Sequence, residues 1–376
     1  MDSALPAPGA EALAASRALL ERIGAELAAR GNWISFARYM ELALYEPGLG
    51  YYAGGAAKLG AAGDFVTAPE MGRLFARTLA RQVAALLEPG AALLEFGAGS
   101  GALAAALLDL LPEGQPYLIL EPSAELAARQ RARLGTRARW LDRLPERFRG
   151  VVLANEVLDA LPVHALAWTR DGIRERGVCA NEGMLAWSER PAAGEVLAAA
   201  RALDIELPPS GCYESELGLA GRAWIAGLAG VLESGAVLIV DYGFPAREYY
   251  HPQRSMGTLM CHYRHRAHGD PFYLPGLQDI TAHVDFSALA HAAVDARLEV
   301  LGYASQAQFL VNCGITEQLL AETDPGDASR YAPLAAEANR LLSPSEMGEL
   351  FKVLALGRGV AQPLVGFAQG DRSHTL

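Results

Sequence analysis

Three glycines in alternate positions follow the apolar run 92–96 and form the first candidate binding loop in the sequence. Gly97, Gly99 and Gly101 allow a tight turn in which a ligand can approach bare backbone at the start of the next helix. Together with Ala102, the loop also fits the dinucleotide fingerprint G-x-G-x-x-G/A. The loop alone therefore predicts a nucleotide-type cofactor and leaves two cofactor classes open.

An acidic residue before this loop favours S-adenosyl-L-methionine over a dinucleotide. Glu95 lies two residues before the first glycine, where its charge would repel a pyrophosphate but attract the sulfonium and ammonium groups of S-adenosyl-L-methionine. The alternative is a glycine turn that only packs a helix against a strand. We expect S-adenosyl-L-methionine as the cofactor, with loop contacts from Glu95, Gly97, Ala98, Gly99 and Gly101.

Two further acids are candidates for contact with the adenosine part of this cofactor. Glu121 ends the apolar run 117–121, and its carboxylate could accept hydrogen bonds from both ribose hydroxyls. Asp142 follows a short strand expected at 139–141 and could meet the adenine amino group. The alternatives are that Glu121 is an ordinary helix-start acid, since Ser123 can cap the next helix, and that Asp142 is simply exposed.

A second candidate loop, which is rich in acidic residues, follows the apolar run 150–154. Asn155 and Glu156 end this expected strand, where loops of open α/β sheets face the ligand crevice, so both should lie beside the transferred group. Glu156 and Asp159 stand at i and i+3 and would share one face if the segment turned helically. Such a pair could orient a guanidinium, which stays protonated and presents a planar fork of donors. Asn155, Glu156 and Asp159 are the predicted catalytic residues, and Asn155 is also a predicted cofactor contact.

The two acids of this loop also have simpler explanations. Asp159 could cap a helix, and Glu156 could be an exposed acid without a specific role.

The Asn/Asp-Pro-Pro-aromatic motif of many exocyclic-amine nucleic-acid methyltransferases is absent from the sequence. A nucleic-acid base is therefore a poor candidate for the acceptor.

The segment 63–70 has two readings. Thr67, Pro69 and Glu70 form a capping box for a short helix, which would explain the motif structurally. Alternatively the preceding loop folds over the cofactor, and the capped helix holds it there. This second reading makes Asp64 a weaker candidate for cofactor contact.

Histidines recur at steps of three in His262, His265 and His268. A charged surface loop that titrates near neutrality explains them better than a metal site, because no strand-borne acid or cysteine set accompanies them. We therefore expect no metal. The sequence also lacks a nucleophile elbow and a Ser-His-Asp order, so hydrolysis is not expected.

The composition limits the partners and the compartment. A net charge of −11 and a pI near 5.3 argue against a nucleic-acid-binding surface. The four cysteines form no C-x-x-C pair, and no apolar run reaches the ~18 residues of a membrane span. Lys58 and Lys352 are the only lysines among 32 basic residues, a bias that indicates a GC-rich, bacterial genome. We expect a cytoplasmic protein without a membrane segment.

A parallel, doubly wound sheet would bring the candidate residues together. Residues 91–376 read as such an α/β domain, and 1–90 read as a helical N-terminal extension with a loop that covers the cofactor. Insertions are expected at about 165–210, where turn pairs suggest antiparallel strands, and at about 243–290. The expected strands are 92–96, 117–121, 139–141, 150–154, 235–241, 298–303 and 351–358, and the expected helices are 11–30, 33–44, 101–111, 123–134 and 215–232.

Over roughly residues 33–360 the sequence resembles the MidA-type family of S-adenosyl-L-methionine-dependent methyltransferases. The segments that carry the resemblance are 34–40, 45–52, 63–70, the glycine loop, 155–163 and 279–286. The resemblance implies an α/β, class I methyltransferase (Rossmann-like) core with an N-terminal helical extension and a late insertion. It carries the family's cofactor role to Glu95, Gly97, Gly99, Gly101 and Glu121.

Eukaryotic members of that family are mitochondrial complex I assembly factors that methylate arginine. The resemblance therefore implies methyl transfer to arginine side chains of a protein substrate, with a respiratory-complex subunit among the candidates. It also places His283 and Asp285 near the crevice. Two alternatives stay open: a small-molecule O- or N-methyltransferase, and a non-catalytic assembly factor that binds S-adenosyl-L-methionine.

Overall fold

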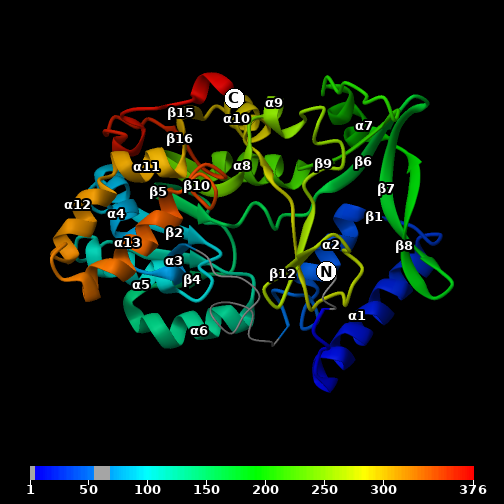
Figure 1. The fold of residues 1–376 in the computed structure, drawn as a ribbon, viewed down its shortest axis with the longest axis horizontal. Helices are drawn as coiled ribbons and strands as arrows, with labels where there is room; N and C mark the ends of the chain where they lie inside the picture. Colours follow the sequence, from blue (N-terminus) through cyan, green and yellow to red (C-terminus); the bar gives the residue numbers. More distant parts are fainter. Residues whose placement is uncertain (1–4, 55–67) are drawn as a thin grey trace. The chain divides into compact units, whose positions relative to one another are not determined.

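The computed structural model describes residues 5–54 and 68–376 (Figure 1). The chain divides into two compact units, each assembled from three stretches of sequence. Unit 1 comprises Met1–Phe65, Asp159–Gly221 and Ala246–His283, and unit 2 comprises Val66–Leu158, Arg222–Pro245 and Val284–Leu376. The sequence predicted a division into residues 1–90 and 91–376. These compact units are defined by contacts and do not test that prediction.

Unit 2 is built on an eight-stranded sheet in the order β4-β3-β2-β5-β10-β16-β15, with β14 paired to β10. The strands from β4 to β10 are parallel, and β16 runs antiparallel to both of its neighbours. The strand order reverses between β2 and β5, which makes the carboxyl ends of these two strands a topological switch point. The strands are β2 (Ala92–Phe96), β3 (Tyr117–Leu120), β4 (Arg139–Leu141), β5 (Phe148–Asn155), β10 (Leu232–Phe244), β14 (Val284–Asp285), β15 (Glu299–Ser305) and β16 (Phe351–Arg358).

Both faces of this sheet are buried, as continuous apolar strands predict. On one face, helices α4, α5, α11, α12 and α13 form a core with strand residues such as Leu93, Val151 and Leu238 (Figure 1). On the other, Phe96 meets Trp224 of α8 edge to face, with ring centroids 5.0 Å apart. The helices are α3 (Ala68–Met71), α4 (Leu74–Leu86), α5 (Ala102–Leu110), α6 (Ala124–Leu134), α8 (Leu219–Val231), α10 (Phe286–Asp295), α11 (Gln306–Asn312), α12 (Ile315–Glu322) and α13 (Ala328–Leu342).

Unit 1 holds two antiparallel sheets. The larger has the order β1-β7-β6-β9 with β8 on β7, and the smaller has the order β12-β11-β13. Its core includes Ile34, Phe36, Tyr39 and Val178, all buried. The elements are α1 (Ala10–Ala29), β1 (Ile34–Ser35), α2 (Phe36–Tyr45), β6 (His164–Thr169), β7 (Gly172–Asn181), β8 (Met184–Pro191), α7 (Gly194–Arg201), β9 (Cys212–Leu217), α9 (Ala246–Tyr249), β11 (Met260–Tyr263), β12 (Arg266–His268) and β13 (Asp279–Thr281).

The spaced histidines lie on a tight hairpin. Arg264 and His265 connect β11 to β12 with φ of 49° and 60°, the pair of left-handed residues that a two-residue type I′ turn requires. His262 and His268 lie on the two strands that this turn joins. In the described part of the chain, no three His, Cys, Asp or Glu side chains are grouped to share a metal ion.

Most of the expected elements are confirmed. The seven predicted strands form with ends shifted by a few residues, and the inserted antiparallel strands appear as β6, β7 and β8. The turn between β7 and β8 is again left-handed, at Glu182 and Gly183. Sequence reasoning missed β9, because residues 215–217 were assigned to the helix expected at 215–232. It also missed the small sheet of β11 to β13, because strands of three or four residues with polar side chains show no clear alternation. Within the described ranges, no helix is long and apolar enough to cross a bilayer.

Candidate functional site

The glycine loop connects β2 to α5 and needs its glycines. Gly97, Gly99 and Gly101 have φ of 58°, 52° and 77°, in the left-handed region that costs other residues roughly 1–2 kcal/mol. The Gly101 N–H donates to the Ala98 carbonyl at 2.7 Å and closes the turn, and the Gly97 N–H donates to the Leu120 carbonyl at 3.1 Å. The loop therefore presents backbone directly before the N-terminus of α5, a favourable place for polar ligand groups.

Glu95 is a buried acid on β2, one strand position before the loop. Its side chain is 2 % exposed, and its Oε2 accepts a hydrogen bond of 2.7 Å from the Tyr117 hydroxyl. Burial raises the pKa of the Glu95 carboxyl to about 7, the Tyr117 hydrogen bond opposes this, and the charge of Glu121 adds to it. A cation bound nearby would favour the ionised carboxylate, so this residue suits a cationic cofactor.

Glu121 is oriented by a buried glutamine from α6. Glu121 Oε1 accepts from the Ser123 N–H at 2.9 Å, and Oε2 accepts from Gln130 Nε2 at 3.0 Å. The same Gln130 Nε2 donates to the Gly99 carbonyl at 2.9 Å, and Gln130 Oε1 accepts from Trp140 Nε1 at 2.9 Å. Gln130 is fully buried and links the glycine loop, the acid after β3 and the indole on β4.

The loop is also held from α3. The Ser100 hydroxyl donates to the Glu70 carboxylate, and Arg133 Nη1 donates to the Ser100 carbonyl at 3.1 Å and to its hydroxyl at 2.8 Å. Thr67 and Asp64 lie outside the described residues, so neither the predicted capping box nor the predicted Asp64 contact is described. Glu70 thus has a role that the capping motif did not suggest, because it connects α3 to the glycine loop.

The acidic loop after β5 begins with a left-handed residue. Glu156 has φ of 53°, and its N–H donates to the Val240 carbonyl at 2.9 Å. Its Oε1 accepts from Asn155 Nδ2 at 3.2 Å and from the Ala68 N–H at 3.3 Å. A non-glycine residue in this conformation is uncommon and is often found at functional sites. Glu156 therefore remains the leading candidate of this loop.

Asp241 of β10 fixes the backbone that follows Glu156. It is fully buried, its Oδ2 accepts from the Val157 and Leu158 N–H groups at 3.2 and 2.9 Å, and its Oδ1 accepts from the Tyr242 N–H at 2.9 Å. A Cβ on Gly97 would lie 3.2 Å from Val157 Cγ2. The glycine loop and the acidic loop are therefore in direct contact, as the switch-point argument predicts.

Two other predicted residues have simpler surroundings. Asp142 follows β4 and is exposed. This position is compatible with contact to the adenine amino group and with a residue that is simply exposed. Asp159 belongs to unit 1, whereas Glu156 belongs to unit 2. The segment 156–163 forms turns and bends, so the helical turn that would align the two acids is absent, and no helix begins at Asp159. Their joint action on a guanidinium stays a prediction.

The residues around the two loops fit S-adenosyl-L-methionine. Glu95 and Glu121 supply acceptors for cationic and hydroxyl groups, and the glycine loop supplies close backbone. Asn155 Oδ1 is buried at the end of β5 and has no hydrogen-bond partner in the described part of the protein. Buried acceptors are normally satisfied, so a donor from a ligand is expected there.

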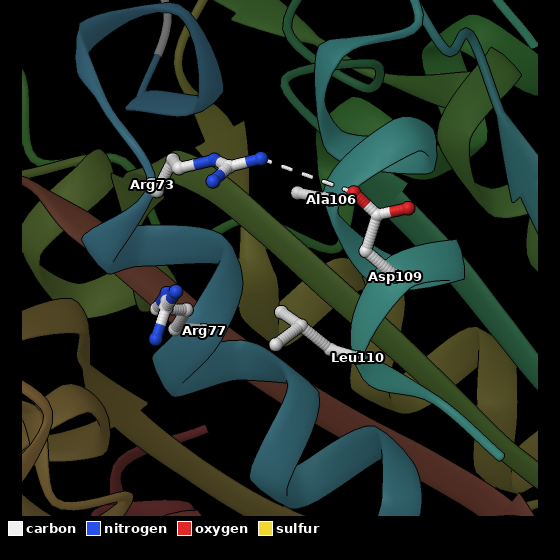
Figure 2. A pocket seen from close by; sticks show the side chains of 5 residues that line it. All are labelled: Arg73, Arg77, Ala106, Asp109 and Leu110. Atoms are coloured by element: carbon white, nitrogen blue, oxygen red, sulfur yellow. Dashed lines mark ion pairs between the residues drawn. The ribbon is translucent and has the colours of Figure 1, made fainter.

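A surface pocket of about 130 Å³ between α4 and α5 is a different kind of feature. Figure 2 shows its lining residues, with Arg73 extending toward Asp109; the two side chains form an ion pair of 3.8 Å. Arg77 is paired with Glu322, and Asp109 also binds Arg137 at 2.6 Å. The pocket's charged groups are thus neutralised within the protein, and it contains no predicted site residue.

Sequence reasoning missed two residues that position the site. Gln130 shares the buried face of α6 with Leu126 and Leu134, at steps of four residues, and a polar side chain on such a face is a usable signal. Asp241 ends the apolar run of β10, and this placement, which it shares with Glu121, is a usable signal as well. Gln130 contacts the Glu121 carboxylate and the Gly99 carbonyl, and Asp241 accepts from the two backbone N–H groups that follow Glu156.

Comparison with known proteins places the chain among methyltransferases. A family model for S-adenosyl-L-methionine-dependent methyltransferases matches residues 74–304. The mitochondrial protein arginine methyltransferase NDUFAF7 of Danio rerio is 30% identical over 385 residues, covering 91% of this chain and 87% of the relative. The Mus musculus protein of the same name is 30% identical over 371 residues, covering 86% of this chain and 80% of the relative.

Solved structures agree with this relationship. A Burkholderia thailandensis protein crystallised with S-adenosyl-homocysteine is 51% identical, with a TM-score of 0.93 over 99% of this chain and 100% of that protein. A native structure from the same organism is 52% identical, with a TM-score of 0.92 over the same shares of the two chains. The fold is that of a class I methyltransferase, the cofactor is S-adenosyl-L-methionine, and the chain belongs to the MidA-type family of S-adenosyl-L-methionine-dependent methyltransferases.

Proposed function

We propose that this methyltransferase transfers a methyl group to arginine side chains of a protein substrate. The observation that carries the proposal is the position of Glu156. This acid has a left-handed backbone at the switch point, in the loop whose next residue, Val157, lies against Gly97. The names of the relatives, which are about 30% identical, support arginine as the acceptor. A respiratory-complex subunit is the kind of substrate that the family resemblance favours.

In this proposal the chain contributes position and electrostatics. S-adenosyl-L-methionine supplies a methyl group on a positively charged sulfur. The Glu156 carboxylate accepts hydrogen bonds from the guanidinium and directs one nitrogen toward the methyl carbon, and Asp159 supports it. Asn155 presents its buried Oδ1 to a donor of the cofactor.

The charges balance in a single displacement. A nitrogen–carbon bond forms and the sulfur–carbon bond breaks, so the sulfur becomes neutral. One proton leaves the attacking nitrogen for the Glu156 carboxylate or water, and the methylated guanidinium keeps its charge. Because a carboxylate stabilises the guanidinium throughout, removal of its charge should affect transfer more than cofactor binding.

The test uses labelled cofactor and a lysate. The purified protein is incubated with methyl-labelled S-adenosyl-L-methionine and a lysate of its host that lacks the gene, and the labelled protein fraction is hydrolysed. We expect label in methylarginine, and a loss of at least tenfold in Glu156→Gln with unchanged cofactor affinity. Label in an organic-soluble product would instead indicate a small-molecule acceptor, and cofactor binding without any transfer would indicate a binding role.

A matched control separates the charge of Glu156 from its backbone conformation. Glu182 also has a left-handed backbone, with φ of 50°, but lies exposed in the turn between β7 and β8. Glu182→Gln makes the same chemical change in a similar backbone conformation, at a residue that belongs to neither loop. It should transfer methyl groups at the rate of the unmodified protein.

A further inference from the structure

A second surface pocket lies at the end of the unit 2 sheet opposite to the glycine loop. Its volume is about 560 Å³, which is in the usual range for small-molecule sites. Its lining includes Leu93, near the amino end of β2, and Tyr117, the first residue of β3. The glycine loop follows the carboxyl end of β2, so this pocket is separate from the predicted cofactor contacts.

Apolar side chains form the floor of this pocket. Leu93, Leu111 and Tyr117 line it and are almost completely buried, whereas Pro112 and Pro116 line it as exposed residues. An apolar group of a ligand that covers these side chains would be stabilised by roughly 25 cal/mol for each Å² of apolar surface removed from water. The pocket therefore suits a ligand with an apolar body.

A glutamine in the loop before β3 supplies an unsatisfied acceptor to the pocket. Gln115 lines the pocket, and its Nε2 donates to the Glu88 carbonyl at 3.4 Å, which orients the amide. Gln115 Oε1 is buried and has no hydrogen-bond partner among the residues that the structure describes. Buried acceptors are normally satisfied, so a donor from a ligand is expected at this oxygen.

The charges that line the pocket leave one carboxylate without a cation. Asp109 is paired with Arg137 at 2.6 Å and with Arg73 at 3.8 Å, and Figure 2 shows the second of these pairs. Glu113 also lines the pocket, is exposed, and forms no ion pair within residues 5–54 and 68–376. The pocket therefore presents two available acceptors, the Glu113 carboxylate and Gln115 Oε1, two residues apart in one loop.

We propose that this pocket binds a small organic amine that carries an aromatic body. A protonated primary amine has a positive charge, three donors and no acceptor, so it can bind both the Glu113 carboxylate and Gln115 Oε1 while its body covers the apolar floor. Glu113 would repel an anionic ligand, and Arg137, the cation in the lining, is already paired with Asp109. The site is distinct from the cofactor site and does not depend on the proposed arginine methylation.

Three indoles of similar size test the class of ligand. Tryptamine is cationic, tryptophol is neutral and indole-3-propionate is anionic. Their dissociation constants are measured by ligand-observed NMR at low ionic strength, with the protein saturated with S-adenosyl-homocysteine so that the cofactor site is filled. Because Glu113 is exposed, we expect tryptamine to bind roughly threefold more tightly than tryptophol and roughly tenfold more tightly than indole-3-propionate.

Variants locate the bound amine. Glu113→Gln removes the charge at an exposed position, and tryptamine and tryptophol should then bind about equally. Glu146→Gln is the matched control, because Glu146 is an exposed acid of unit 2 that lies outside the pocket and forms no ion pair in the described part of the chain; it should keep the preference. Gln115→Met removes the unsatisfied oxygen and should weaken tryptamine binding roughly threefold. The S-adenosyl-homocysteine affinity of each variant verifies that it is folded.

Every outcome decides for or against the amine site. A preference for tryptamine that is lost in Glu113→Gln and kept in Glu146→Gln supports it. Equal binding of tryptamine and tryptophol to the unmodified protein, or no binding of tryptamine up to about 10 mM, would overturn it. A preference that survives Glu113→Gln would also overturn it, because the amine would then bind elsewhere, for example where the methyl acceptor binds. No methyl transfer is measured, so these results are independent of whether the lysate yields methylarginine.

Discussion

The Gln130 side-chain amide lies 3.0 Å from the Glu121 carboxylate and 2.9 Å from the Gly99 carbonyl, so one buried group holds both candidate cofactor contacts. Because both hydrogen bonds come from the same nitrogen, the glycine loop and the acid after β3 cannot shift independently. The cofactor site of this family member is therefore organised from α6 as well as from the sheet.

Replacing Gln130 should weaken cofactor binding more than catalysis. Gln130→Met keeps the length of the side chain but leaves Glu121, the Gly99 carbonyl and Trp140 Nε1 without their partner, at a cost of roughly 1–3 kcal/mol. We expect a 10–100-fold higher Kd for S-adenosyl-L-methionine by calorimetry, a kcat within threefold at saturation, and altered Trp140 fluorescence. Gln253→Met at an exposed position is the control; a Kd within twofold of the unmodified protein for Gln130→Met would contradict the positioning role.

Burial of Glu95 should make stability depend on pH in a defined window. Its pKa rises from 4.5 to about 7 on folding, so the folded state binds the proton more tightly than the unfolded state. The free energy of unfolding should therefore fall as pH rises from 4.5 to about 7, by at most about 3 kcal/mol, and stay level above that. Urea unfolding at pH 5 and pH 8 should show that Glu95→Gln gains more stability relative to the unmodified protein at pH 8 than at pH 5. A constant difference between the two pH values would refute this assignment.

The same residue predicts how cofactor affinity changes with pH. If the cation of S-adenosyl-L-methionine favours ionised Glu95, binding releases a proton below pH 7, and affinity should rise between pH 5 and about 7 and then level off. Calorimetry in buffers of different ionisation enthalpy measures that proton directly. Glu95→Gln should bind more weakly and lose this part of the pH dependence.

Gly101 allows the conformational and the binding roles of the glycine loop to be separated. Gly101 and Gly90 have φ of 77° and 79°, and a Cβ on Gly101 would meet its nearest neighbour at an ordinary 3.5 Å, whereas one on Gly90 would meet nothing within 4 Å. Both alanine variants should lose roughly 1–2 kcal/mol of stability. Only Gly101→Ala should also raise the Kd of the cofactor, and equal Kd values for the two variants would show that the loop does not contact it.

Replacing Asp241 with asparagine should lower both the stability of the protein and the rate of methyl transfer. Three backbone N–H groups point at its two carboxylate oxygens, so in Asp241→Asn the side-chain NH₂ must face at least one of them. We expect a loss of roughly 1–3 kcal/mol in urea unfolding, together with slower methyl transfer because the loop after Glu156 is released. Asp327→Asn, at the N-cap of α13, is the control, since asparagine caps helices equally well; equal stabilities of the two variants would argue against the role of Asp241.

The sequence contained enough to predict the sheet and the loops that it presents. Continuous apolar runs marked the strands, and the predicted cap of α6 is confirmed, since the Ser123 hydroxyl accepts from the Leu126 N–H at 3.3 Å. The partners of the site acids could not be predicted this way. Gln130 reaches Glu121 only because α6 turns back toward the loop that follows β3, and Asp241 reaches Leu158 only because β10 pairs with β5. A local pattern can mark Gln130 and Asp241 as unusual, but which groups they contact depends on tertiary packing.

The hydrogen bonds that join the segments resembling the family show the same limit. Tyr52, Asp159 and Asp279 each lay in a segment that resembled the family, but no spacing in the sequence connects them. The hydrogen bond of Tyr52 to Asp279 spans 227 residues. The family resemblance thus identified the segments, and only the fold could join them.

The division of the chain also determines how the protein can be taken apart. It passes from one compact unit to the other at 65/66, 158/159, 221/222, 245/246 and 283/284. One truncation or one protease cut therefore cannot release either unit as a whole, because each consists of non-adjacent gene segments. Exchanging one unit between homologues would require grafting three pieces at once, so new substrate preferences in this family should arise by point substitution more readily than by recombination.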